Sequence, residues 1–362
     1  MQTALVVLVL RAPTLVFGLP IGRAVDRFGG RPMAILDMAA RAALLVLLVL
    51  SGTAAGHGRL PLPAVLIIGG LAGALSPASY AAVRWIVPRV VPGERVARAN
   101  AVIALGDQVP LILGTALVGP SLTLFGPVYS VLVPAGMFLV ALGLALGLPA
   151  PPTSRGVAAD PASVAEPASF AEPAAPRRWP RRVVALIALS TAYYFAYGPY
   201  ETASPNFIRE QIHAGSGTYS FLWSLFGVGA LVTLPLAPAL ARRRPGLVNA
   251  VGAVSWGLIM LPVVAVDSLA VAVPMFLAGG LVWGPYTAIE ATALQRWVAP
   301  ARHGAVFGVQ HALLTTAMPL GAAVGAVALE AVRPGLILAA SAAACAAAGL
   351  LALTNRGLRV SS

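Results

Sequence analysis

The chain has 362 residues, of which 59% are hydrophobic and 10% are charged. Soluble globular proteins carry roughly 25% charged residues, so this composition excludes an ordinary soluble domain and indicates a membrane protein with many spans. The net charge is +12 and every one of the 24 basic residues is arginine. These arginines are spread over short loops, and no soluble segment is long enough for a nucleic-acid-binding domain. We therefore expect no nucleic-acid partner.

Hydropathy predicts eleven transmembrane helices, because a helix that crosses a bilayer needs about 20 apolar residues. In chain order the apolar runs lie at residues 3–22, 33–53, 62–84, 99–122 and 127–149, and then at 183–200, 217–240, 247–266, 269–292, 305–328 and 333–354. The prediction is an all-α, multi-pass protein of the cytoplasmic membrane. It has an N-terminal helical half at 1–149 and a C-terminal half at 183–362.

The segment between the halves, 150–182, is rich in proline and alanine. It repeats Pro-Ala-Ser-x-Ala-Glu-Pro and ends in the basic cluster Arg-Arg-Trp-Pro-Arg-Arg. Such a segment holds too few large apolar residues to fold by itself. We predict that it is a linker between the two helical halves.

Arginine is distributed unevenly between the two sides of the predicted bundle. If the loop after the first helix is cytoplasmic, 19 arginines lie in cytoplasmic segments, and only Arg59, Arg209 and Arg333 lie on the other side. Positive residues favour cytoplasmic loops. We therefore expect the linker and the C-terminus to be cytoplasmic and the chain as given to begin outside.

Two segments of the chain resemble each other. Residues 69–88 and 279–300 both open with Gly-Gly-Leu and contain a mid-helix proline. Both end in Arg-Trp-x-x-Pro, at Arg84-Trp85 and at Arg296-Trp297. If the halves are parallel repeats, the first half lacks its opening helix, and we expect one helix to be missing from the N-terminus. The alternative is that two helix exits share Arg-Trp by chance.

The loop between the first two helices carries the most specific motif. It reads Gly22-Arg-Ala-Val-Asp26-Arg27-Phe-Gly29-Gly30-Arg31, and resembles the loop Gly-x-x-x-Asp-Arg-x-Gly-Arg-Arg/Lys between helices two and three of major facilitator superfamily transporters. The turn is expected at Gly29 and Gly30, where glycine adopts positive φ at little cost. The resemblance implies that Asp26 and Arg27 tie the two halves together in one conformation. Plain anchoring of the loop by its positive charges remains the alternative.

Two further loops support the same resemblance. The segment from Val87 to Asn100 is similar to the family's loop between helices four and five, especially in drug or siderophore exporters. The segment His303-Gly304-Ala-Val-Phe307-Gly308 resembles the loop before helix eleven. The resemblance implies a bundle of two halves that transports a small molecule by alternating access. We expect proton-driven export of an amphiphilic compound, with an inactive or regulatory transporter-like protein as the alternative.

Charges within the predicted helices are candidates for proton coupling, because ionisable groups in a bilayer are costly and usually functional. The candidates are Arg11, Asp107, Glu290 and His311. Asp107 either carries a proton or is neutralised by Arg11, and Glu290 either carries a proton or neutralises a neighbouring arginine. A satisfied interior histidine is the alternative for His311. Asp37 and Arg41, four residues apart, are expected to pair directly.

Three tyrosines and a glutamate form a stripe on the first helix of the second half. Tyr193, Tyr197, Tyr200 and Glu201 lie on one helical face. A cavity lined in this way would suit flat cationic amphiphiles through cation–π contacts. Ordinary aromatic packing with interfacial tyrosines is the alternative.

Other classes of function find no support in the sequence. No Cys/His spacing indicates a metal site, no phosphate-binding loop indicates ATP, and no catalytic triad or His-Glu-x-x-His motif indicates an intramembrane enzyme. We therefore expect a monomeric transporter, without cofactor or metal, whose partners are the lipid bilayer, its small-molecule substrate and protons.

Overall fold

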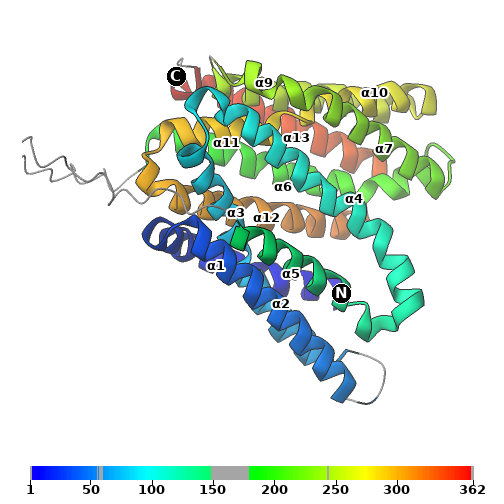
Figure 1. Ribbon diagram of the computed structural model, residues 1–362. Coiled ribbons are helices and arrows are strands. Elements are labelled where there is room, and N and C mark those ends of the chain that lie inside the picture. Colours follow the sequence, from blue (N-terminus) through cyan, green and yellow to red (C-terminus); the bar gives the residue numbers. More distant parts are fainter. Residues whose placement is uncertain (1, 55, 57–59, 148–178, 243, 360–362) are drawn as a thin grey trace, which may run out of the picture.

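A computed structural model describes residues 2–54, 56, 60–147, 179–242 and 244–359 as a bundle of α-helices (Figure 1). This confirms the all-α fold. The predicted linker falls almost entirely outside the described residues, so the division at 150–182 stays a prediction. The helices are α1 (Gln2–Phe28), α2 (Gly30–Ala54), α3 (Leu62–Val90), α4 (Val96–Tyr129), α5 (Leu132–Gly147), α6 (Arg181–Glu210), α7 (Ser216–Thr233), α8 (Ala237–Leu240), α9 (Pro245–Val266), α10 (Leu269–Trp283), α11 (Tyr286–Trp297), α12 (His303–Ala328), α13 (Pro334–Thr354) and α14 (Arg356–Arg359).

The helices have the length and surface that a bilayer requires. In the described part, eight are long and apolar enough to cross a membrane, or nine if the bent pair Pro120–Tyr129 and Leu132–Gly147 is one span. The helices α1 and α4, with 27 and 34 residues, also exceed the length of a span. Large apolar side chains face outward, among them Val140 at 66% and Leu351 at 70% exposure. This set is consistent with the eleven predicted helices.

The helices pack in two groups, an N-terminal group (α1–α5) and a C-terminal group (α6–α14). Within the first, α1 and α2 pack on α3, and α5 packs on α2; within the second, α13 packs on α6 and α9, and α7 on α10. The groups meet where α12 packs on α1 and α3, and where α4 packs on α11. We call the end of the bundle that holds Phe28, Val90 and Trp297 the linker end. In Figure 1 the two groups converge at this end and diverge toward the other.

Two predicted helix ends were wrong. The run 62–84 continues to Val90 in α3, so that Arg84 lies inside the helix and not at its exit. The run 183–200 continues to Glu210 in α6, with Pro199 inside the helix, and Glu201 is therefore not at a helix end. The run 269–292 continues to Trp297 as one candidate span, and its helix is interrupted between α10 and α11, where Pro285 has no N–H to donate.

Candidate functional site

A closed contact between the two groups forms the linker end of the bundle. The helix α12 begins at His303, and its backbone N–H groups of Gly304 and Ala305 donate hydrogen bonds to the two carboxylate oxygens of Asp26, at 2.6 and 2.8 Å. Asp26 thus caps a helix of the other group, where the helix dipole favours a negative charge. A second bridge runs from Arg89 Nη2 to the carbonyl oxygen of Pro300, at 2.7 Å.

Glycines allow α1 and α12 to approach this closely. A Cβ added at Gly22 would meet the backbone of Gly304, and one added at Gly308 would meet the carbonyl oxygen of Gly18 and lie 3.0 Å from the Cα of Gly22. In each helix the two glycines are four residues apart and therefore lie on one face. We call these four residues the glycine seam.

The other residues of the motif loop, Gly29, Gly30, Arg31 and Arg27, make different contacts. Gly29 adopts φ +91°, which confirms the predicted turn there, whereas Gly30 is the first residue of α2 and has helical φ. Gly30 is needed for another reason, since a Cβ would lie 2.7 Å from the carbonyl oxygen of Ala82. Arg31 Nη2 donates to the carbonyl of Leu146 at the end of α5, at 2.8 Å. Arg27 is exposed and stacks over Phe28, so that its predicted role in tying the halves together stays a prediction.

A polar cluster lies deeper in the bundle, on α3 and on the helices that face it. Arg84 Nη2 is 3.1 Å from Asp107 Oδ2, and the guanidinium lies 3.5 Å from the ring centre of Tyr80. The Arg84 side chain is 4% exposed and that of Asp107 is 49% exposed. Asp107 is therefore paired with an arginine that was expected at the cytoplasmic exit of its helix. The side chain of Arg11, its predicted partner, lies outside the described residues.

The C-terminal group completes this cluster from α12. Ser76 Oγ and His311 Nε2 are 3.0 Å apart, the His311 ring lies 4.3 Å from the Tyr80 ring, and the Tyr80 hydroxyl donates to Gln310 Oε1 at 3.4 Å. His311 thus has a hydrogen-bond partner in the N-terminal group, and its role in proton coupling stays a prediction. Ser76, Tyr80 and Arg84 are spaced by four residues, and this polar stripe on one face of α3 is the sequence signal that would have revealed them.

Glu290 on α11 is the least satisfied group of the cluster. The residue is fully buried, and among the described residues neither carboxylate oxygen makes a hydrogen bond of standard geometry. The Ser190 hydroxyl and the Gln310 amide lie beside the carboxyl group as hydrogen-bonding neighbours, and Arg84 is close enough to act on it electrostatically. A buried charge without a partner costs several kcal/mol, and the predicted role of Glu290 in proton coupling stays a prediction.

A family model described as Major Facilitator Superfamily matches residues 1–293. The chain belongs to the Major Facilitator Superfamily. An uncharacterised MFS-type transporter of Sinorhizobium fredii, y4rN, is 25% identical over 348 residues, which cover 94% of this chain and 83% of that protein. The chain is thus a multi-pass membrane transporter with a small-molecule substrate.

Solved transporters of the superfamily share the fold. A bacterial homologue of the iron transporter ferroportin, in an outward-facing state, superposes with a TM-score of 0.70 at 16% identity over 97% of this chain and 89% of that one. FucP in the outward conformation superposes with a TM-score of 0.69 at 15% identity, over 98% of this chain and 90% of that one. The human organic anion transporter MFSD10 superposes with a TM-score of 0.75 at 16% identity, over 97% of this chain and 83% of that one.

In this MFS transporter the predicted tyrosine stripe lies within an aromatic core of the C-terminal group. Tyr193, Tyr197 and Tyr200 are 1%, 6% and 1% exposed. The rings of Tyr193 and Tyr197 stack on Trp283 at 5.5 and 5.4 Å, and all three tyrosines contact the edge of Trp256. Glu201 is half-buried on the same helix.

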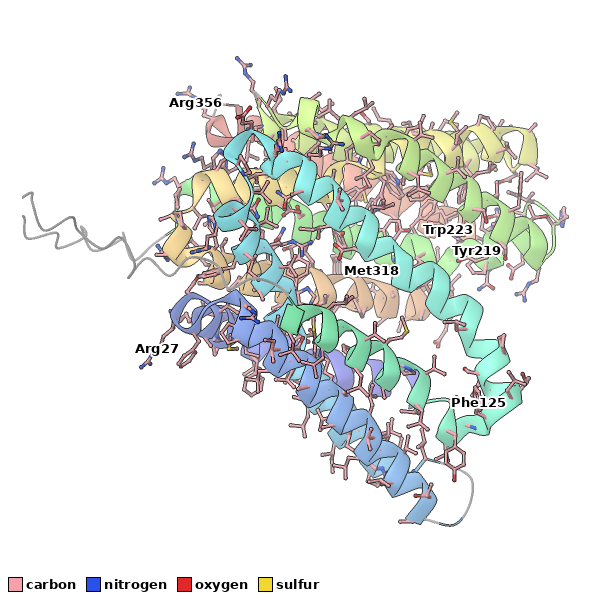
Figure 2. The ribbon with its side chains drawn as sticks, viewed as in Figure 1. Arg27, Phe125, Tyr219, Trp223, Met318 and Arg356 are labelled. Carbon is pink, nitrogen blue, oxygen red and sulfur yellow. The ribbon has the colours of Figure 1, made fainter. Side chains whose placement is uncertain are left out.

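A partly exposed layer of rings lies beside this core. Tyr194, Trp223 and Trp283 are only partly buried. Figure 2 places Tyr219 and Trp223 far from Arg27 and Arg356, which mark the linker end. The stripe stays a predicted substrate surface.

Proposed function

We propose that this MFS transporter exports an amphiphilic cation from the cytoplasm in exchange for protons. The linker end, which carries the arginine-rich loops, is assigned to the cytoplasmic side by the charge asymmetry. Its closure by Asp26 and the glycine seam then makes this state the outward-facing one. Two of the solved structures that share the fold were obtained in an outward state, which supports this assignment.

Glu290 carries the proposal. It is a fully buried carboxyl group at the junction of the two helical groups, next to Tyr286 and the aromatic layer, with Ser190 and Gln310 beside it. In the outward-facing state its oxygen would take a proton from the outer side. When the linker end opens, the O–H bond would break, the proton would leave to the cytoplasm, and the carboxylate would be available to a cation. Because the buried site binds either a proton or the cation, the inward movement of protons is coupled to the outward movement of the cation.

The test uses vesicles that contain the purified protein, an imposed pH gradient and a fluorescent lipophilic cation. We expect the wild type to move the cation against a proton flux. Glu290→Gln should abolish the dependence on the pH gradient, because the amide keeps the shape of the carboxyl group and cannot titrate. Glu330→Gln, at an exposed acid on the other end of α12, is the matched control and should transport normally.

Other outcomes would replace the proposal. If an anionic dye moves and the cation does not, the cation proposal is wrong and Arg84 becomes the candidate substrate ligand. If neither dye moves although the protein is inserted, and the distance across the linker end never changes, the alternative of an inactive or regulatory protein is favoured.

A further inference from the structure

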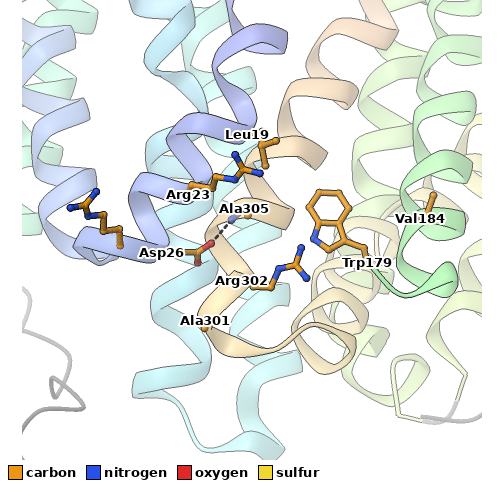
Figure 3. A pocket seen from close by; sticks show the side chains of 9 residues that line it. Leu19, Arg23, Asp26, Trp179, Val184, Ala301, Arg302 and Ala305 are labelled. Carbon is orange, nitrogen blue, oxygen red and sulfur yellow. Dashed lines mark hydrogen bonds between the residues drawn. The ribbon is translucent and has the colours of Figure 1, made fainter. Parts of the chain in front are cut away.

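A pocket of about 720 Å³ lies at the linker end, where α1, the start of α6 and the start of α12 come together (Figure 3). It is separate from the polar cluster and from the aromatic layer. Leu19 and Arg23 line it from the N-terminal group, and Trp179, Val184 and Arg302 line it from the C-terminal group. The pocket therefore depends on both groups.

The charge of the lining favours an anion. Arg23, Arg27 and Arg302 are among the lining residues, and the acid there is Asp26. Both oxygens of Asp26 already accept hydrogen bonds from the backbone of α12. Arg23 and Arg27 are exposed, so their guanidinium groups are accessible to a ligand. Guanidinium groups bind phosphate well, because their donors match the geometry of its oxygens.

The apolar part of the lining indicates that the anion is attached to a hydrocarbon chain. Leu19 lies one helical turn before Arg23 on α1, which is about 6 Å nearer the middle of the bundle. Val184, on α6, is 51% exposed and faces the same pocket. The Trp179 ring stands at the start of α6, the level at which tryptophan prefers to lie in a bilayer. A free phosphate makes no favourable contact with these apolar side chains, whereas an acyl chain would pack against them and remove them from water.

We propose that this pocket binds the headgroup phosphate of an anionic phospholipid, and that the bound lipid stabilises the state in which the linker end is closed. Arg23 moves with the N-terminal group and Arg302 with the C-terminal group. A phosphate that contacts both can do so only while α1 and α12 are together. A ligand that binds one state better shifts the equilibrium toward that state. The proposal is independent of the substrate and of the coupling ion.

The binding test counts lipids on the intact protein by mass spectrometry after exposure to phosphatidylglycerol or phosphatidylcholine. We expect retention of phosphatidylglycerol, weakened about fivefold by Arg23→Gln and about fivefold by Arg302→Gln, from the usual contribution of one arginine near an anionic surface. Arg98→Gln, at an exposed arginine of α4 that does not line the pocket, is the control and should bind as the wild type does. Equal retention of the two lipids, or an equal loss in the control, would overturn the proposal.

The conformational test places spin labels at Phe28 and Ala299, which are exposed on the two groups at the linker end. In phosphatidylcholine vesicles, added phosphatidylglycerol should raise the population with the short distance. The double variant Arg23→Gln/Arg302→Gln should lose this response. If soluble glycerol phosphate produces the same shift, the pocket takes a free phosphate and the lipid assignment is wrong. If phosphatidylglycerol leaves the wild type unchanged, the stabilising role is wrong.

Discussion

Arg84 shows how one side chain can organise the centre of a membrane protein. Its guanidinium is almost fully buried between Asp107 and the ring of Tyr80, and its backbone carbonyl accepts a hydrogen bond of 2.8 Å from Gln295 of the other group. An arginine at this depth is costly unless it is paired. The charge pair and the cation–π contact offset this cost.

The two members of the Arg84–Asp107 pair should respond differently to removal. Asp107→Asn leaves a buried guanidinium without its counter-ion, whereas Arg84→Met leaves a carboxylate that is already half exposed. We expect Asp107→Asn to destabilise the protein by about 1–3 kcal/mol, and to lower the unfolding temperature in detergent more than Arg84→Met does. The double variant should unfold near Arg84→Met. A larger loss for Arg84→Met than for Asp107→Asn would contradict this account of the cluster.

At the scale of elements, α12 packs on its neighbours through two different glycine surfaces, of which one joins the two groups. Toward α1 it presents the glycine seam, and toward α6 it presents Gly321, where a Cβ would meet the carbonyl oxygen of Phe195. Contacts of this kind bring backbones together in a membrane, where helices gain no hydrophobic free energy by leaving lipid. The contact with α6 lies within one group, whereas the seam lies between groups and must separate when the linker end opens.

A methyl group in the seam should therefore change the conformation and not the fold. In Gly308→Ala the new Cβ overlaps the backbone of Gly18, and overpacking of this kind costs about 1–3 kcal/mol. We expect the closed population, measured by the spin labels at Phe28 and Ala299, to fall by about 5- to 150-fold relative to the open one. Gly106→Ala, at a helical glycine with no neighbour within 4 Å, should leave the distances unchanged. A closed state that tolerates Gly308→Ala would show that the seam does not control closure.

At the scale of the whole molecule, the closed contacts are concentrated at one end. The capping by Asp26, the bridge from Arg89 and the hydrogen bonds of Asn100 to Thr292 and Gln295, at 2.9 and 2.6 Å, all join the two groups there. Between Asn100 and Gln295 the polar atoms are buried, which makes this contact strong only while the groups are together. The molecule is thus built for an equilibrium between states in which this end is closed or open.

The assignment of this end to the cytoplasm predicts which positions are accessible from outside the cell. Val332, between α12 and α13, is exposed at the other end, and Arg356 is exposed at the linker end. A membrane-impermeant maleimide should label Val332→Cys in intact cells, and Arg356→Cys only after the membrane is permeabilised. The native Cys345 is buried and should stay unlabelled in both experiments. The reverse pattern would invert the orientation, and with it the proposed direction of transport.

The sequence by itself determined the features that depend on short range or on bulk hydropathy. The helical bundle follows from the length of the apolar runs, and the turn at Gly29 follows from a motif whose glycine needs positive φ. The pairing of Asp37 with Arg41, at 2.6 Å, is confirmed because residues four apart always meet on a helix. In each case the interacting groups are near one another along the chain.

Only the tertiary structure decided which groups meet across helices. Asp26 finds its donor at Gly304, 278 residues later, and the partner of Asp107 in this state is Arg84, whereas the sequence had offered Arg11. Glu290 could be recognised as an intramembrane acid from the sequence, but not as a fully buried one beside Ser190 and Gln310. The physical reason is that helical periodicity shows which side chains share a face, whereas the packing of the bundle determines what that face contacts.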